Sequence, residues 1–535
     1  MSLLAIENLR LKIGGEPILD GVSLSLDPGR ILALTGESGS GKSMTALSIV
    51  RLLPRAAKVG GAVGFDGTDL LGLSERRMCA VRGKSIGMVF QEPMTALNPL
   101  RTIGDQVAET IIVHGEGTRR EAFERAGALL DRVGLDPGRF PPTRFPHELS
   151  GGQRQRVVIA MAIALRPKLL IADEPTTALD VTTQARILDL LAGLVEETGM
   201  AMLLITHDLA VVAGIADDIA VMRKGEVVEQ GDTRWILSRK RHPYTRALLE
   251  ASGHRVRLPT KPPSAPLLDV IEVTRDYVAA SGSLLSRPVR RRAVRSVSFS
   301  LCKGERLGLV GESGSGKSTL ARAILGLDPV KSGEIRVEGR PLVPDDRAQR
   351  RKMQAVFQDP YGSFNPRHRV GRLIGEPFHL LDEPPRGHDR EEAVAEALDA
   401  VGLSPDDARK YIHEFSGGQR QRIAIARALI VRPELIVFDE AVSALDVRVR
   451  ARILDLIAGL CESRSLAYIF ISHDLAVVES IADRVLVMHE GAIVEQGEAA
   501  QVFSNPHHPY TRSLLAAAPR LPNFSTLEEG DANGS

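Results

Sequence analysis

This chain of 535 residues has few cysteines, no long apolar stretch and almost no excess of charge. Its three cysteines, Cys79, Cys302 and Cys461, are isolated, which excludes a Cys-x-x-Cys metal site and fits a reducing compartment. The longest strongly apolar run, residues 157–165, is far shorter than the ~18 residues of a membrane-spanning helix. The start of the chain has no apolar signal core. We therefore expect a soluble cytoplasmic protein.

Charge of neither sign dominates. The 68 Lys and Arg residues nearly balance the 67 Asp and Glu residues, and a net charge of +1 argues against a global field that gathers nucleic acid or anionic membrane. The irregular stretch 279–295 contains five basic residues, Arg287, Arg290, Arg291, Arg292 and Arg295. We interpret it as a solvated loop between two strands. Contact with lipid headgroups or RNA is the alternative interpretation.

One ordered series of motifs occurs twice in the chain. GESGSGKS occurs twice, and each copy is followed by an SGGQ segment, an apolar stretch ending in Asp-Glu, and a His-Asp pair. From the SGGQ segment onward the two copies are separated by a constant 266 residues. Units of this size indicate a tandem domain duplication, because solenoid repeats span only about 20–50 residues. One chain therefore carries two complete modules.

The boundary between the modules is readable from composition. Residues 252–266 mix proline, serine and basic residues without periodicity, which is typical of a linker, and a strand-like run then restarts the pattern of the N-terminus. We predict a first domain at 1–251, the linker at 252–266, a second domain at 267–520 and a polar tail at 521–535. Each domain is predicted to be an α/β P-loop nucleoside triphosphatase.

The phosphate site is predicted from the context of GESGSGKS. Each copy follows a short apolar strand and opens a helix, which separates a real P-loop from a chance glycine-rich turn. Backbone amides and the helix start favour a bound triphosphate, so we expect ATP and Mg²⁺ as cofactors. Lys42 and Lys317 are expected to reach the β- and γ-phosphates, and the hydroxyls of Ser43 and Ser318 to bind Mg²⁺. The remaining predicted phosphate-binding residues are Gly36, Ser38, Gly39, Ser40, Gly41, Gly311, Ser313, Gly314, Ser315 and Gly316.

The acidic pairs supply candidate metal and catalytic groups. Buried parallel strands deliver their carboxyl ends to the crevice where ligands bind. We expect Asp173 and Asp439 to hold the Mg²⁺ shell through water, and Glu174 and Glu440 to polarise the attacking water as general bases. A salt-bridged strand end is the alternative for an isolated acidic pair, but these pairs follow P-loops at equivalent positions.

A histidine and a glutamine also recur at equivalent positions of the two halves. His207 and His473 each end another apolar strand, and we expect them to contact the γ-phosphate and the catalytic water. A satisfied structural histidine is the alternative for either one alone. Gln91 and Gln358 offer neutral amides that can reach the metal or the water.

The complete motif set, in the same order in both halves, resembles the ATP-binding-cassette ATPases over essentially the whole chain. The resemblance implies two cassettes packed head to tail, each a mixed sheet core with a helical signature subdomain, with ATP between the P-loop of one half and the SGGQ signature of the other. Asp180 and Asp446 would couple the two sites. The SGGQ segments precede helical runs predicted at residues 154–165 and 420–430. The signature residues assigned to nucleotide binding are Ser150, Gly152, Gln153, Ser416, Gly418 and Gln419.

One difference between the halves concerns the adenine base. Tyr277 lies where the family places an aromatic residue that stacks on adenine, whereas the first half has Ile13 there. The resemblance therefore implies weaker base stacking in the first site. Neither Glu174 nor Glu440 is replaced, so the sequence gives no reason to regard either site as inactive.

A finer resemblance concerns HPYT segments at 242–251 and 508–517, one after each cassette. They resemble the dipeptide and oligopeptide importer branch, especially its fused two-cassette members for microcin C, peptides or glutathione. A helix merely packed on the cassette is the alternative. No cysteine follows Cys461, so the iron–sulfur cluster of some relatives is not expected.

This resemblance implies a peripheral protein on the cytoplasmic face of the inner membrane. Its partners would be two integral-membrane permease subunits and an extracytoplasmic solute-binding protein, with no nucleic acid. Residues 92–149 and 359–415 are predicted to form helical subdomains that receive permease helices. Fused cassettes also act on ribosomes or DNA, but the short proline-rich linker and the absence of cysteine pairs disfavour that alternative. The HPYT segments disfavour an exporter, and the sequence does not identify the solute.

Overall fold

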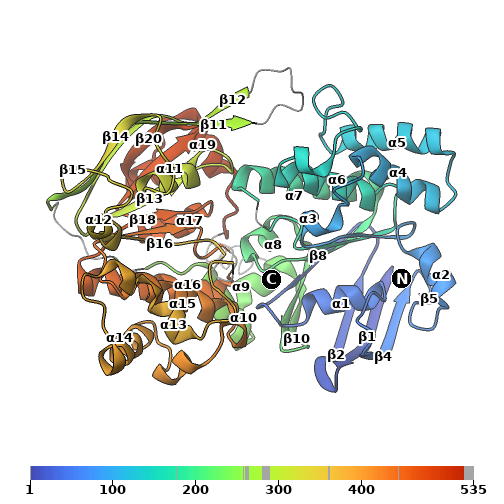
Figure 1. The fold of residues 1–535 in the computed structure, drawn as a ribbon. Helices are drawn as coiled ribbons and strands as arrows, with labels where there is room; N and C mark the ends of the chain where they lie inside the picture. The colour runs from blue at the N-terminus through green and yellow to red at the C-terminus, as the bar shows by residue number, and fades with distance from the viewer. Residues whose placement is uncertain are drawn as a thin grey trace, which may run out of the picture.

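The computed structural model describes residues 2–177, 179–256, 258, 264–279, 289–359, 362–443 and 445–522. Within this part of the chain the two halves repeat one architecture and lie side by side, the first half in blue to green and the second in yellow to red (Figure 1). Each half contains a six-stranded sheet, a four-stranded sheet and covering helices. The predicted tandem α/β fold is confirmed.

The six-stranded sheets form the centre of each half. Their central strands are short, apolar and buried on both faces, as in β3, β7 and β8, because helices cover both sides. In the first half the order is β10 (Glu226–Asp232), β9 (Asp218–Arg223), β3 (Ile31–Thr35), β8 (Ala201–Ile205), β7 (Leu169–Asp173) and β6 (Ile86–Val89). In the second half it is β16 (Met353–Val356), β17 (Leu435–Asp439), β18 (Ala467–Ile471), β13 (Arg306–Val310), β19 (Arg484–His489) and β20 (Ala492–Glu498).

Only the outermost pair of each six-stranded sheet, β9 with β10 and β19 with β20, is antiparallel. Strands β3, β7 and β8 are parallel, and so are β13, β17 and β18. The carboxyl ends of parallel neighbours meet at one edge of the sheet, which is where such sheets bind ligands. This topology brings the P-loop, the acidic pair and the histidine of each half together.

The four-stranded sheets are antiparallel. They are formed by β2 (Glu16–Leu26), β1 (Leu4–Ile13), β4 (Ala57–Phe65) and β5 (Thr68–Asp69), and by β12 (Val289–Cys302), β11 (Pro266–Ala279), β14 (Ser332–Val337) and β15 (Arg340–Pro341). Apolar side chains from these sheets and from the six-stranded sheets share one core in each half. Ile13, at the end of β1, packs partly buried against this core in the first half.

Helices cover the sheets. In the first half they are α1 (Lys42–Ile49), α2 (Glu75–Val81), α6 (Gly151–Ala162), α7 (Val181–Thr198), α8 (Leu209–Ile215), α9 (Thr233–Arg239) and α10 (Pro243–Ser252). In the second half they are α11 (Lys317–Ile324), α12 (Arg347–Lys352), α15 (Gly417–Leu429), α16 (Val447–Arg464), α17 (Leu475–Ile481), α18 (Ala499–Ser504) and α19 (Pro509–Ala517). No helix in the described ranges is both long and apolar enough to cross a membrane.

The predicted helical subdomains are present in both halves. The first contains α3 (Pro93–Ala96), α4 (Ile103–Val113), α5 (Arg119–Arg132) and the 3₁₀ helix η1 (Pro146–Glu148). The second contains α13 (Val370–Ile374), η2 (Glu376–Leu380), α14 (Gly387–Ala400), η3 (Pro405–Arg409) and η4 (Ile412–Glu414). Figure 1 shows each group projecting beside its sheet.

Two sequence predictions need correction. The irregular stretch 279–295 is not a loop throughout, because β12 begins at Val289 and pairs with β11 up to Ala279. Arg292 in β12 forms an ion pair with Asp276 at 3.2 Å, so its charge is partnered within the hairpin. The linker is also shorter than predicted, since α10 includes Ser252 and β11 begins at Pro266. Arg287 and all but the first two residues of the predicted tail lie outside the described residues.

Candidate active site

The two P-loops require their glycines. Gly36 and Gly41 have φ angles of 148° and 105°, and added Cβ atoms would lie 2.2 Å from the Met222 carbonyl oxygen and 2.6 Å from Leu19. The second loop has the same geometry, with φ angles of 148° at Gly311 and 107° at Gly316. Side chains at these positions would therefore collide with neighbouring strands as well as strain the backbone.

The P-loop lysines are held against their own loops. Nζ of Lys42 donates to the carbonyl oxygens of Gly36 and Glu37 at 2.8 and 2.9 Å, and Lys317 makes the equivalent bonds at 2.8 Å. Burial lowers the pKa of both lysines, although nearby carboxylates oppose the shift. An ammonium group has three donors, so each lysine retains one for a phosphate oxygen.

Two P-loop hydroxyls also favour a bound phosphate. Ser40 and Ser315 are 4% and 5% exposed, and neither hydroxyl has a hydrogen-bond partner within the described residues. Buried polar atoms are normally satisfied, so these two hydroxyls are available to a ligand oxygen. Their position inside the loops fits the phosphate-binding role predicted from sequence.

Each site brings a hydroxyl and a carboxylate together for Mg²⁺. Ser43 Oγ donates to Asp173 Oδ1 at 3.1 Å, and Ser318 makes the same bond to Asp439 at 3.1 Å. Burial raises the pKa of Asp173 to about 6 and raises that of Asp439. Groups of three or more His, Cys, Asp or Glu ligands are absent from the described residues. One hydroxyl and one carboxylate in each site fit Mg²⁺, which commonly binds one or two carboxylates together with substrate phosphates and water.

Glu174 lies at the centre of the first site. Its carboxylate accepts hydrogen bonds from Gln91 Nε2 and Thr177 Oγ1, both at 2.9 Å, and His207 Nδ1 lies 3.3 Å away. Burial raises the pKa of Glu174, but the hydrogen bond and charge of His207, aided by Thr177 and Lys42, lower it to about 2. The carboxylate is therefore ionised and held in place. Sequence analysis missed Thr177, for which no local pattern gave a signal.

The second site holds its glutamate differently. His473 Nδ1 lies 3.5 Å from Glu440 Oε1, while the Ser443 hydroxyl donates instead to the Glu440 main-chain oxygen at 2.9 Å. In the described part of the chain, Gln358 makes no hydrogen bond to Glu440. Both glutamates have left-handed backbone, with φ of 46° at Glu174 and 51° at Glu440, a conformation that costs energy in non-glycine residues and clusters at functional sites.

The start of each signature helix differs from expectation. Helices were predicted from residues 154 and 420, but they begin at Gly151 and Gly417. Ser150 is the N-cap, and the Gln153 side chain accepts from the Ser150 amide at 2.9 Å, which forms a capping box that Ser416 and Gln419 repeat. Both glutamine side chains are thus engaged within their own helix.

The signature glycines pack against neighbouring helices. An added Cβ at Gly152 would lie 2.3 Å from Thr183, and one at Gly418 would lie 2.4 Å from Val449. No hydrogen bond in the described ranges joins a signature residue to the opposite P-loop. Nucleotide contact by these residues therefore stays a prediction.

The two halves meet at their P-loops. Arg448 of α16 donates to Glu37 Oε1 at 2.7 Å, and Thr182 of α7 donates to Glu312 Oε1 at 2.5 Å. Helices α16 and α7 follow Asp446 and Asp180, whose charges act on Lys42 and Lys317 of the opposite half. Each half therefore presents the start of this helix to the other half's P-loop.

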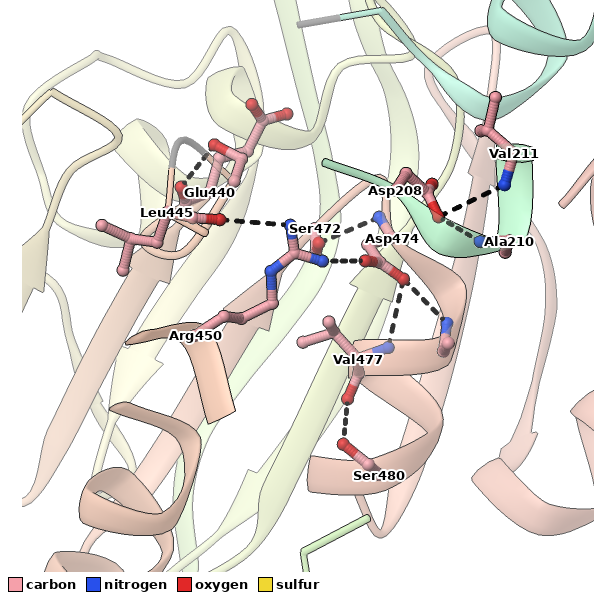
Figure 2. Close-up of polar contacts among 12 residues, drawn as sticks. Asp208, Ala210, Val211, Glu440, Leu445, Arg450, Ser472, Asp474, Val477 and Ser480 are labelled. Carbon is pink, nitrogen blue, oxygen red and sulfur yellow. Dashed lines mark hydrogen bonds and ion pairs between the residues drawn. The ribbon is translucent and has the colours of Figure 1, made fainter. Parts of the chain in front are cut away.

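The aspartates after the two histidines also meet across this contact. Figure 2 shows Asp208 and Asp474 near each other, each accepting from the first amides of its helix, α8 or α17. Arg450 Nη1 donates to Asp474 Oδ2 at 2.7 Å. Burial raises the pKa of Asp208, and the charge of Asp474 raises it further.

The predicted adenine-side residues lie at the ends of equivalent strands. Tyr277 is half-buried near the end of β11, with its hydroxyl donating to Asp328 Oδ2 at 2.9 Å and the Arg275 guanidinium 5.0 Å from its ring centre. Ile13 ends β1 and packs partly buried against the core. Base stacking by Tyr277 stays a prediction.

Comparison with known proteins agrees with this geometry. The ABC transporter family model matches residues 19–177 and 294–443, and the model for the oligopeptide/dipeptide transporter C-terminal region matches 228–258 and 494–531. The latter matches include both HPYT segments. Cassette cores and C-terminal regions thus both occur twice.

Related sequences match along nearly their whole length. The chain is 47% identical over 507 residues to the peptidoglycan transport ATP-binding protein YejF of Agrobacterium fabrum, covering 94% of this chain and 92% of that protein. It is 47% identical over 563 residues to the glutathione import ATP-binding protein GsiA of Escherichia coli K12, covering 97% and 90%. Among solved structures, cbiO1 from Clostridium perfringens is 29% identical, with a TM-score of 0.40 over 45% of this chain and 92% of that one. This chain belongs to the ABC transporter family and is an ATPase with two ATP-binding cassettes.

Proposed function

We propose that this chain energises a membrane importer for peptides or peptide-like solutes by hydrolysing ATP at two composite sites. The observation that carries the importer assignment is the C-terminal region after each cassette, which matches the oligopeptide/dipeptide transporter model twice. Relatives named for peptidoglycan transport and glutathione import agree with a peptide-like solute. The head-to-tail contacts at Glu37 and Glu312 support composite sites.

The first composite site would combine P-loop residues 36–43 with Gln91, Glu174 and His207 and with the opposite signature. The second would combine residues 311–318 with Gln358, Glu440 and His473. The signature residues are Ser416, Gly418 and Gln419 for the first site and Ser150, Gly152 and Gln153 for the second. Closure of the two halves on ATP would bring each signature helix start, whose amides favour anions, to the γ-phosphate.

Hydrolysis would follow from the groups around Glu174. Lys42 and the loop amides bind the phosphates, and bound Mg²⁺, held by Ser43 and Asp173, would neutralise charge on them. Glu174 would orient the attacking water and accept its proton as the new O–P bond forms and the bond from the γ-phosphorus to the β–γ bridging oxygen breaks, so that ADP leaves. A carboxylate with a pKa of about 2 is a weak base, so its bonds to Gln91, Thr177 and His207 must rearrange when ATP arrives.

Membrane attachment would come from partners. We propose two permease subunits that dock on the helical subdomains, with an extracytoplasmic solute-binding protein completing the complex. The side chain of Leu100, between β6 and α4, is 85% exposed, and Phe90 beside Gln91 is 39% exposed. Apolar residues exposed next to the Gln91 loop suit a buried permease helix. The chain would then act at the cytoplasmic face of the inner membrane.

Deletion of the gene tests this proposal. Uptake of labelled glutathione, di- and tripeptides and muropeptides should be measured in the deletion strain, and we expect loss of at least one of them. Wild type and Lys58→Ala, an exposed lysine of β4, should restore uptake, whereas the Lys42→Ala, Lys317→Ala double variant should not. Unchanged uptake of every solute, with ATP-dependent co-sedimentation of the chain with ribosomes, would overturn the importer assignment.

A further inference from the structure

Each HPYT helix begins with a fixed tyrosine. His242 caps α10, and its Nδ1 accepts from the Tyr244 amide at 3.1 Å, while Glu229 accepts from the His242 amide at 3.3 Å. In the second half Tyr510 donates its amide to His508 at 3.2 Å, and Glu495 accepts from His508 at 3.0 Å. Capping of this kind fixes the direction in which the first helical turn points. The histidine of HPYT therefore positions the tyrosine.

The tyrosine hydroxyls contact the P-loops. Tyr244 Oη accepts a hydrogen bond from the Glu37 amide at 3.1 Å, and Tyr510 Oη accepts from the Glu312 amide at 3.0 Å. Both rings are clamped, since Arg223 lies 5.1 Å from the ring centre of Tyr244 and His489 stacks on Tyr510 at 3.9 Å. Burial raises the pKa of Tyr244 and raises that of Tyr510 to about 12, so both hydroxyls are neutral at physiological pH.

The P-loop glutamate is where three contacts meet. Besides the hydroxyl on its amide, Glu37 offers its carbonyl oxygen to Lys42 at 2.9 Å and its carboxylate to Arg448 of the other half at 2.7 Å. Glu312 repeats the pattern, with Lys317 at 2.8 Å and Thr182 at 2.5 Å. One residue therefore links the HPYT helix, the phosphate-binding lysine and the opposite cassette.

The HPYT helices also pack on the opposite half. Helix α10 contacts α16, and α19 contacts α7; Figure 1 shows α10 and α16 in the lower part of the view, where the two halves meet. Leu248 and Ser252 of α10 line a small cavity together with Gly36, Asp446 and Val447. His254, just after α10, lies 2.7 Å from Asp455 of α16. The same helix thus touches its own P-loop and its partner cassette.

We propose that Tyr244 and Tyr510 are positioning residues for ATP turnover, which make the geometry of each P-loop depend on the opposite cassette. The hydroxyl fixes the backbone of the P-loop glutamate, and this fixes both the acceptor for the lysine and the carboxylate that reaches across the interface. The proposal rests on the ATPase activity of the cassettes and not on the importer assignment. It gives the HPYT segment a role beyond packing.

Tyrosine-to-phenylalanine variants of the full chain test this role, because they remove the hydroxyl and keep the ring. Loss of one such hydrogen bond should lower kcat about 3- to 10-fold in Tyr244→Phe and Tyr510→Phe, with a smaller change in KM. The Hill coefficient for ATP should fall toward 1. Binding of a fluorescent ATP analogue should lose cooperativity to the same degree, which gives a readout independent of hydrolysis.

Tyr468→Phe is the matched control. Its hydroxyl donates to the Ile481 carbonyl oxygen in the core, and Tyr468 pairs with Arg306 at the start of β13, the strand end opposite to the P-loop, so this variant should lower Tm without changing kcat or cooperativity. If Tyr244→Phe and Tyr510→Phe behave like Tyr468→Phe, the positioning role is wrong. These measurements need no permease, so they stand whether or not the importer assignment does.

A double-mutant cycle addresses the route of coupling. Tyr244→Phe should cost less turnover in an Arg448→Ala background than in wild type, because both groups act through Glu37. Independent, additive effects would overturn the proposal. Arg448 is a partly exposed side chain, so the chain carrying Arg448→Ala is expected to fold even if a tyrosine variant is unstable. If a tyrosine variant is unstable, unchanged ATP cooperativity in Arg448→Ala alone would overturn the proposal.

Discussion

Nη1 of Arg448 lies 2.7 Å from Oε1 of Glu37, which joins a helix of the second cassette to the P-loop of the first by an ion pair. At the equivalent contact, between α7 of the first cassette and the P-loop of the second, Glu312 accepts a hydrogen bond from the neutral hydroxyl of Thr182. The two halves are thus joined by contacts of different chemistry. Salt screens a partly exposed ion pair more strongly than a hydrogen bond from a hydroxyl. Contact at the first site should therefore depend more on ionic strength.

Replacing Arg448 by threonine should remove this difference. We expect ATP turnover of the wild type to fall about two- to fivefold between ~0.05 and ~0.5 M salt, as a partly exposed ion pair worth up to ~1 kcal/mol weakens. Arg448→Thr should show a flatter salt profile. Arg452→Thr, at an exposed position of the same helix, is the control and should keep the wild-type profile. Identical profiles for all three proteins would show that the ion pair does not influence turnover.

Both glutamates after the acidic strands should be required for hydrolysis. Glu174→Gln and Glu440→Gln should each lower turnover sharply, because removal of a positioned general base costs about 10²–10⁴-fold. Glutamine has the same shape and tolerates the left-handed backbone as well as glutamate does, so ATP binding should persist. Single-turnover hydrolysis with parallel ATP titration measures both effects. Near-wild-type activity of either variant would identify that site as regulatory.

The P-loop and acidic-pair geometry could be predicted from sequence because it depends on local patterns. A short apolar strand followed by a glycine-rich turn and a helix fixes the loop, and parallel strands bring Asp173 to Ser43 and Asp439 to Ser318. The helix start at Gly151 was also readable, since serine followed three residues later by glutamine is a capping-box pattern. Reading that pattern would have corrected the predicted start at residue 154.

Other contacts could not be predicted because nothing local encodes them. Tyr244 and Glu37 are 207 residues apart, and they meet because α10 packs against α8 in a buried cluster that includes Ala33 of β3. The arginine-rich start of β12 is predicted to be a loop from sequence alone, because a charged segment has no strand pattern when its pairing partner is unknown. In the structure Asp276 of β11 faces Arg292 and Lys331, which stabilises a polar hairpin.

Nucleotide affinity should differ between the two sites. Base–aromatic stacking contributes about 1–3 kcal/mol in nucleic-acid complexes, so Tyr277→Ala should weaken ATP binding at the second site by about 5- to 150-fold. Ile13→Tyr should tighten binding at the first site. Tyr277→Phe loses the hydrogen bond to Asp328 but keeps the ring, so its affinity for ATP should be close to that of the wild type. Titration with ATP should resolve two affinities in the unmodified chain, and a single affinity would contradict this prediction.

The last prediction concerns Arg450 and the two aspartates at the contact between the halves. Burial and the charge of Asp474 raise the pKa of Asp208, whereas the charges of His207 and Arg450 lower it. A carboxyl with a raised pKa binds protons in the folded chain that the unfolded chain has released. Its contribution to stability is therefore lost as pH rises through the folded pKa. Removal of Arg450 should steepen this loss.

Arg450→Gln introduces the residue found at the equivalent position of the first half, Gln184. It should destabilise the chain by about 1.5–3 kcal/mol near pH 7.5, because Asp474 loses a charged hydrogen bond and the guanidinium no longer offsets the repulsion between the two carboxylates. At a second, lower pH the cost should be smaller, because the raised pKa of Asp208 favours its protonation, which relieves the repulsion. Urea unfolding at both pH values measures the difference, with Arg452→Gln as control. An equal loss of stability at both pH values would show that Arg450 acts through packing and not through the aspartate pair.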